Sequence, residues 1–423
     1  MEVILILLFE IVCGNVLNSH SAPNDEYSLV CIIVTSIVLF IFIFRKIKNY
    51  EIIFFIAYIL RLAILFADYF HWFPVLHSGG DTEMFHRISL DIMDKSLYND
   101  EVLIVTNYPY FTGAIYLLIG PQRLFVQYIN VLFGMWTLYY IYKSLSLLRL
   151  KRKTIKLFLY VGCLFPHLII LSGILLREAI VEFSVAASVY FFLKWFLKNK
   201  KMDFIVSLCF VLLGSLMHSG VFLLFIGYLM ALLFYNHRTN KISFSFSSIL
   251  YGLFSILIVV LIIVQTDVFT EKFNKLEDVD SFEEYEVLAD QKAGSTYLTW
   301  LDVKGTEQIL LYSPLKMFYF LFSPIPFDWR SASDVIAFLL DSVVYFILVL
   351  GIFRKYKNLN GRRERRLVLF LIISLLCTIF IFSYGTSVSG TALRHRAKIL
   401  PLLMVITAIC YDRKRKKLSS SFL

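Results

Sequence analysis

The sequence predicts an all-α integral membrane protein, a polytopic bundle of about twelve transmembrane helices with two long external loops. Of its 423 residues, 59% are hydrophobic and only 17% are charged, whereas a soluble domain carries about 25% charged residues. The mean hydropathy is +0.73. Apolar stretches recur along the whole chain, so we expect one membrane domain over residues 1–423.

A helix needs roughly 20 apolar residues to cross the hydrocarbon core. The stretches that approach this length are residues 2–17, 28–44, 52–68, 124–142, 157–175, 179–196, 203–217, 220–235, 244–266, 334–353, 367–383 and 399–411. The first begins MEVILILLFEIV and has no positively charged start. We therefore expect a retained span there and not a cleaved signal peptide.

The net charge of +10 is explained by membrane topology. Basic residues gather at the ends of apolar stretches, as in 149–156, 362–366 and 413–417. When the spans alternate in direction, these clusters fall on one side, which the positive-inside rule assigns to the cytoplasm. Both termini are then cytoplasmic, and no nucleic-acid partner is needed to account for the charge.

Two loops on the opposite, external side are long: residues 69–123 and 267–333. Each contains an apolar run too short to span, 110–120 and 317–323, which we expect to form interfacial or re-entrant helices. The acidic stretch 277–290 predicts a solvated amphipathic helix or a lid. Because long loops are often functional, their polar residues are the first candidates for a site.

The first loop contains the segment SGGDTEMFHRI, in which Asp81 follows two glycines that permit a tight turn. An acid here can accept a proton from a hydroxyl group or bind a divalent metal. An Asp before a helix is also a favoured N-cap, and both roles stay open for Asp81. Glu83, His86 and Arg87 follow at helical spacing and are its nearest companions.

Arg177 and Glu178 lie at an external turn between two strongly apolar spans. The planar fork of an arginine matches the oxygens of a phosphate. The alternative is an interfacial salt bridge between side chains that snorkel toward water. Glu182 follows one helical turn later and could orient Arg177.

Arg394, His395 and Arg396 open the last span on its external side. The positive-inside rule disfavours a basic cluster there, so the cluster predicts an anionic ligand such as a lipid phosphate. The alternative is an ordinary stop signal or headgroup anchor. Arg61 and Asp341 lie within spans, and we expect each to pair inside the bundle or to face a cavity.

The order of these segments resembles bacterial membrane proteins of surface-polysaccharide assembly. The segments that carry the resemblance are GGDTEMFHRIS, NYPYFTGAIYLLIG, LFVQYINVLFGMW, PHLIILSGILLREAIVEF and TALRHRAKILP. They are similar to the O-antigen and capsule repeat-unit polymerases and to the C superfamily of membrane glycosyltransferases. Both groups use polyprenyl-phosphate or polyprenyl-diphosphate sugars at the outer face. The loop with Asp81 follows the third predicted span here, whereas it follows the first in the C superfamily.

The resemblance implies an integral membrane glycosyltransferase that polymerises polyprenyl-diphosphate-linked oligosaccharide repeat units at the outer face of a bacterial cytoplasmic membrane. We expect no large soluble C-terminal domain, which favours this polymerase over a transferase of single sugars from a polyprenyl-phosphate donor. The other alternative is a flippase or transporter of lipid-linked glycan. The unusual charges gather at the external ends of the spans, which argues against a path across the membrane.

By the same resemblance, Asp81 matches an acid that acts as base toward the acceptor or helps to hold a metal. The catalytic candidates are Asp81, Glu83 and Glu178, and the substrate- and phosphate-binding candidates are His86, Arg87, Arg177, Arg394, His395 and Arg396. The expected cofactor is a divalent cation, Mg²⁺ or Mn²⁺, with Asp81 as a ligand. The expected partners are the polyprenyl-linked glycan, membrane lipids and other polysaccharide-assembly proteins. We expect the candidate arginines and Asp81 to converge on one external cavity.

Overall fold

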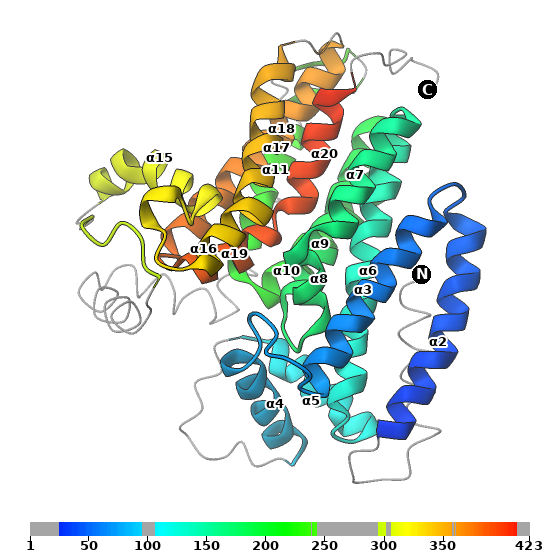
Figure 1. The fold of residues 1–423 in the computed structure, drawn as a ribbon. Coiled ribbons are helices and arrows are strands. Elements are labelled where there is room, and N and C mark those ends of the chain that lie inside the picture. The colour runs from blue at the N-terminus through cyan, green and yellow to red at the C-terminus, as the bar shows by residue number, and fades with distance from the viewer. Residues whose placement is uncertain are drawn as a thin grey trace. The chain divides into compact units, whose positions relative to one another are not determined.

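The computed structural model describes residues 25–94, 106–237, 239–242, 295–301, 306–357, 359 and 361–412. The described residues are almost entirely helical (Figure 1), which confirms the predicted fold class at the level of secondary structure. The chain divides into two compact units. The first takes the described residues of Met1–Ser146, Arg152–Ala187 and Leu213–His218, and the second takes those of Leu147–Lys151, Ser188–Leu212 and Ser219–Leu423.

The first unit consists of apolar helices of unequal length. Its helices are α2 (Asp25–Lys46), α3 (Glu51–Tyr69), α4 (Gly80–Met93), α5 (Tyr108–Ile119), α6 (Arg123–Leu147), α7 (Arg152–Leu164) and α8 (Pro166–Gly173), and two further helices, α9 (Glu178–Lys198) and α10 (Lys201–Met217), each contribute residues to both units. The apolar window of α6 is 94% buried, whereas that of α3 is only 44% buried. Ile52, Phe55 and Ile59 form an exposed apolar face on α3, as expected of a helix that faces lipid.

Proline divides one predicted span of this unit into two helices. Residues 157–175 were expected to form one helix, but α7 ends at Leu164 and α8 begins at Pro166, and the two are bent by 50°. Proline lacks the N–H that would continue the helix and favours the first helical position. The residue before it, Phe165, is extended, which is the conformation that a following proline imposes.

The second unit combines further helices with one short hairpin. Its remaining elements are η1 (Ser219–Leu223), α11 (Leu224–Phe234), β1 (Tyr235–Asn236), β2 (Lys241–Ile242), α15 (Thr306–Phe322), η2 (Pro326–Asp328), α16 (Ala332–Ala337), the π-helical turn η3 (Phe338–Ser342), α17 (Val343–Tyr356), α18 (Arg362–Tyr384), α19 (Ser389–Ala397) and α20 (Leu400–Tyr411). The strands β1 and β2 pair antiparallel. Helices α11 and α18 pack closely because Gly227 has no side chain: a Cβ atom there would lie 2.3 Å from the carbonyl oxygen of Phe370.

Five helices of the described chain are long and apolar enough to cross a membrane: Glu51–Tyr69, Arg123–Leu147, Glu178–Lys198, Ala332–Tyr356 and Arg362–Tyr384. The number rises to 6 if the bent pair α7–α8 is one span. All six coincide with predicted spans, and shorter apolar helices occur at the predicted spans 28–44, 220–235 and 399–411. A membrane protein is therefore supported, but the predicted count of about twelve spans is not confirmed.

Some predictions fall on other parts of the chain. The predicted spans 2–17 and 244–266 and the acidic stretch 277–290 lie outside the described residues. Both short apolar runs of the predicted loops are helical, since 110–120 lies almost wholly in α5 and 317–323 forms the end of the longer helix α15. Their placement at a membrane interface stays a prediction.

Candidate functional site

Helix α4 carries four of the predicted site residues, and its start is fixed by Gly79 and Thr82. Gly79 has a φ of 111°, a conformation that favours glycine. The Thr82 hydroxyl accepts a hydrogen bond from the Gly79 N–H at 2.9 Å and donates one to the Gly79 carbonyl at 2.8 Å. Asp81 therefore lies in the first turn and is not the N-cap residue. The positive end of the helix dipole favours its negative charge there.

Close packing against α5 holds α4 in place (Figure 1). Ser89 and Thr112 share a hydrogen bond between their hydroxyl groups, and Ser89 also donates to the carbonyl of Phe85 at 2.6 Å. Gly113 permits the approach, because a Cβ atom there would lie 2.7 Å from Cγ2 of Ile92. The two helices of the first predicted loop thus form one rigid pair.

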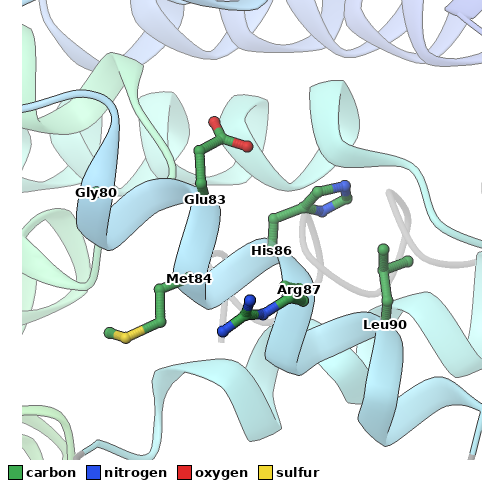
Figure 2. A pocket seen from close by; sticks show the side chains of 6 residues that line it. All are labelled: Gly80, Glu83, Met84, His86, Arg87 and Leu90. Carbon is green, nitrogen blue, oxygen red and sulfur yellow. The ribbon is translucent and has the colours of Figure 1, made fainter.

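A pocket of about 400 Å³ lies along α4. Its lining residues are Gly80, Glu83, Met84, His86, Arg87 and Leu90 (Figure 2). Helical spacing of three and four residues brings these side chains together on neighbouring turns. The pocket combines a carboxylate, an imidazole and a guanidinium with two apolar side chains, a set that can bind polar and apolar parts of one ligand.

Arg123, at the start of α6, is the main partner of Glu83. Its Nη1 donates to Oε2 of Glu83 at 3.0 Å, and its Nη2 lies 2.7 Å from Oε1. Nη2 is also 4.0 Å from Oδ2 of Asp68, a buried carboxylate that accepts a hydrogen bond from Gln127 at 2.6 Å. Arg123 was not among the predicted site residues. The signal that singled out Arg394 would have found it, since it too is an arginine at the predicted external end of a span.

The electrostatics of this cluster separate the charge states of Glu83 and His86. The hydrogen bond from Arg123 lowers the pKa of Glu83, so its carboxylate is ionised at neutral pH. Burial lowers the pKa of His86, and the charge of Arg123 lowers it further while Glu83 opposes them. Nδ1 of His86 lies 2.9 Å from the Tyr116 hydroxyl. His86 is therefore a neutral imidazole, held by one ring nitrogen, beside an ionised acid.

Arg177 and Glu178 lie at a break between helices, as predicted. Residues 174–177 separate α8 from α9, and Arg177 is half-buried whereas Glu178 is fully buried. The break is held by Asn130 of α6, whose Nδ2 donates to the carbonyls of Ile174 at 2.8 Å and Leu176 at 3.0 Å. The same Nδ2 lies 2.8 Å from the Tyr108 hydroxyl of α5. Asn130 therefore links the α4–α5 pair to the turn that carries Arg177.

Arg396 in the second unit is enclosed by protein groups. It is fully buried and forms an ion pair with Asp341, the partner that this mid-span acid was expected to have. Its Nη1 donates to the carbonyls of Leu321 at 2.9 Å and Ser323 at 2.6 Å. Its guanidinium lies 5.1 Å from the centre of the Tyr345 ring. These contacts join α19 to the end of α15, to the π-helical turn η3 and to α17.

The neighbours of Arg396 on α19 are more accessible. Arg394 and His395 are half-buried, and Nδ1 of His395 lies 3.0 Å from the Thr386 hydroxyl. Of the predicted basic cluster, these two side chains and not Arg396 present polar surface. Their role toward an anionic ligand stays a prediction.

The predicted site residues fall into two sets. Asp81, Glu83, His86, Arg87, Arg177 and Glu178 belong to the first unit, and Arg394, His395 and Arg396 belong to the second. Within the described residues, no group of three or more His, Cys, Asp or Glu side chains is arranged to hold a metal ion. Because Glu83 is bound to Arg123, Asp81 has no evident companion for a metal on α4, and we assign the chemistry of this pocket to side chains.

A comparison of the sequence with protein-family models and with curated proteins finds no match.

Proposed function

We propose that this protein is an integral membrane glycosyltransferase of surface-polysaccharide assembly that polymerises polyprenyl-diphosphate-linked repeat units at the outer face of the cytoplasmic membrane. The observation that carries the proposal is the α4 pocket, in which neutral His86 and ionised Glu83 line a volume of about 400 Å³. This volume is within the range of small-ligand sites. An open pocket beside candidate membrane spans suits an acceptor sugar that is delivered on a lipid.

In the proposed reaction, His86 is the general base. When Nδ1 donates to Tyr116, Nε2 has a lone pair and can accept the proton of an acceptor hydroxyl. The deprotonated oxygen attacks the anomeric carbon of the donor sugar. Glu83, fixed by Arg123, accepts a hydrogen bond from a second hydroxyl and orients the acceptor. Asp81, one turn earlier on α4, is a second candidate for this orienting role.

The bond that breaks joins the anomeric carbon to the carrier phosphate. The leaving polyprenyl diphosphate takes the electron pair and develops negative charge, which a guanidinium can stabilise. Arg177 precedes α9, and the N-terminus of a helix favours an anion. We propose Arg177 as the phosphate-binding residue of the first unit, and Arg394 and His395 as anion-binding candidates of the second.

The test uses His86→Ala and Arg177→Ala in cells that lack the chromosomal gene. Both variants should reach the membrane at the normal level but should lose the ladder of long glycan chains on a gel. Arg45→Ala, an exposed arginine at the end of α2, is the matched control and should retain the ladder.

The banding pattern also separates the alternatives. One repeat unit per lipid in the deletion strain supports the polymerase, and a truncated unit indicates a transferase of single sugars instead. Complete lipid-linked units that accumulate on the cytoplasmic side would indicate a flippase. A normal ladder in both variants overturns the proposed function.

A further inference from the structure

Arg61 places a guanidinium in the middle of α3, a candidate membrane span. It is fully buried, and its Nη1 donates to the carbonyl of Ala57 at 3.0 Å. A charge at membrane depth is costly unless an opposite charge is near. Glu182 of α9, which is also fully buried, interacts electrostatically with Arg61. The two charges therefore couple α3 to the first turns of α9.

The neighbouring helices leave space for Arg61. A Cβ atom at Gly134 of α6 would lie 2.8 Å from Nε of Arg61 and 2.6 Å from Cβ of Ser172 of α8. Any side chain at this position would displace the guanidinium or α8. Arg61 thus lies where α3, α6 and α8 meet, close to the end of α8.

Asn130 lies one helical turn before Gly134 on α6, and it acts on the same region. It binds the carbonyls of Ile174 and Leu176 in the break between α8 and α9. Arg177 is the next residue of the chain, and Glu182 follows it by little more than one turn of α9. The direction in which Arg177 leaves the break is therefore fixed by Asn130 on one side and by the Arg61–Glu182 interaction on the other.

We propose that Asn130 and Arg61 are positioning residues for Arg177, and that they aim its guanidinium at the phosphate of a prenyl carrier. This inference rests on the proposed function, in which Arg177 binds that phosphate. Neither residue touches the ligand. Each acts by holding the backbone of the break so that the Arg177 fork is oriented before the ligand arrives, and orientation of this kind reduces the cost of binding.

The experiment measures binding of geranylgeranyl phosphate to the purified full-length protein in lipid nanodiscs. Arg177→Ala should weaken binding by about tenfold or more. Asn130→Ala should weaken it by a similar factor, but it should have no further effect in the Arg177→Ala background, because both act through one guanidinium. Thr137→Val is the matched control: this buried hydroxyl of α6 bonds only to Phe133 of its own helix at 2.9 Å, and its loss should leave binding unchanged.

The buried charges provide a second, independent arm. Arg61→Gln with Glu182→Gln removes both charges, so no uncompensated ion remains, and should weaken binding in the same non-additive manner. The exchange Arg61→Glu with Glu182→Arg should restore part of the affinity. This arm decides the question if Asn130→Ala fails to accumulate in the membrane.

The outcomes separate two failures. Normal binding by Arg177→Ala would overturn the proposed role of Arg177 itself. Weakened binding by Arg177→Ala with normal binding by the Asn130 and Arg61 variants would overturn only the positioning inference. An Asn130→Ala effect that persists in full without Arg177 would also overturn it, since the residue would then act elsewhere.

Discussion

Arg123 binds Glu83 with both terminal nitrogens of its guanidinium, at 3.0 Å from Nη1 to Oε2 and at 2.7 Å from Nη2 to Oε1. The side chain of Arg123 is 13% exposed and that of Glu83 is 54% exposed. An accessible acid is thus fixed by a largely enclosed base. An exposed ion pair contributes about 1 kcal/mol or less to stability, so the main consequence of this pair is the orientation and ionisation of Glu83.

Loss of Arg123 should therefore impair the reaction more than the fold. Arg123→Ala releases the Glu83 carboxylate, and we expect the rate of glycan extension in membrane vesicles to fall by about tenfold or more. Arg123→Lys keeps the charge but not the fork and should give an intermediate rate. A wild-type rate for Arg123→Ala would contradict a role of this pair in the pocket.

The pH dependence of glycan extension should report the neutral state of His86. Its pKa lies below the ordinary histidine value of about 6.5, so the imidazole remains a base at pH 6.5. Activity should fall only at lower pH, where the ring gains a proton. His86→Gln should abolish this acid limb along with most of the activity. An acid limb at or above the ordinary value would argue against His86 as the base.

The same pKa difference has a consequence for stability with a definite sign. The unfolded chain binds a proton on His86 more readily than the folded chain does. Folding stability therefore declines as pH falls below about 6.5, the unfolded value. Thermal unfolding of wild type and His86→Gln in detergent, recorded across this pH range, should show a smaller decline in the variant. Equal declines would mean that other groups dominate.

The contact of α4 with α5 should depend on the absence of a side chain at Gly113. Gly113→Ala places a Cβ atom against Ile92 and should lower the free energy of unfolding by about 1–3 kcal/mol. Adding Ile92→Ala should recover part of this loss, because the clash is removed. Gly390→Ala is the control, since a Cβ atom there meets nothing within 4 Å. A Gly113→Ala protein as stable as wild type would contradict the packing described.

Arg396 and Asp341 should prove to be a structural pair. Replacing either alone leaves a buried charge without its counter-ion, which costs about 3–5 kcal/mol, so Arg396→Met should lower the unfolding temperature strongly. The double variant Arg396→Met with Asp341→Leu should be more stable than either single variant. Arg394→Ala, by contrast, should leave the unfolding temperature unchanged. A strong loss of stability in Arg394→Ala would reverse these assignments.

The sequence predicted those features that depend on neighbours along the chain. The helical spacing after Asp81 predicted α4 correctly, and six apolar stretches correspond to helices long enough to span, one of them broken. Pro166 was a visible signal for that break, but hydropathy averaged over the window concealed it. The N-cap was ambiguous because Thr82 and Gly79, rather than Asp81, satisfy the backbone at the start of α4.

The features that could not be predicted depend on contacts between distant residues. Glu83 and Arg123 are forty positions apart, and Asn130 reaches carbonyls more than forty positions away. Asp341 was expected to have a partner, but only the structure identifies Arg396. Backbone carbonyls carry no sequence signal, so neither the enclosure of Arg396 nor the link made by Asn130 could be anticipated.

The π-helical turn Phe338–Ser342 places Asp341 opposite Arg396, and such a turn holds one residue more than an α-helical turn. Each residue of an α-helix rotates the chain by about 100°. Deletion of a single residue here would give a regular helix of otherwise similar composition and would rotate the acid away from its counter-ion. The spacing of this segment is therefore as strict a requirement as the identity of its residues, and homologous chains should vary in its apolar letters long before they vary in its length.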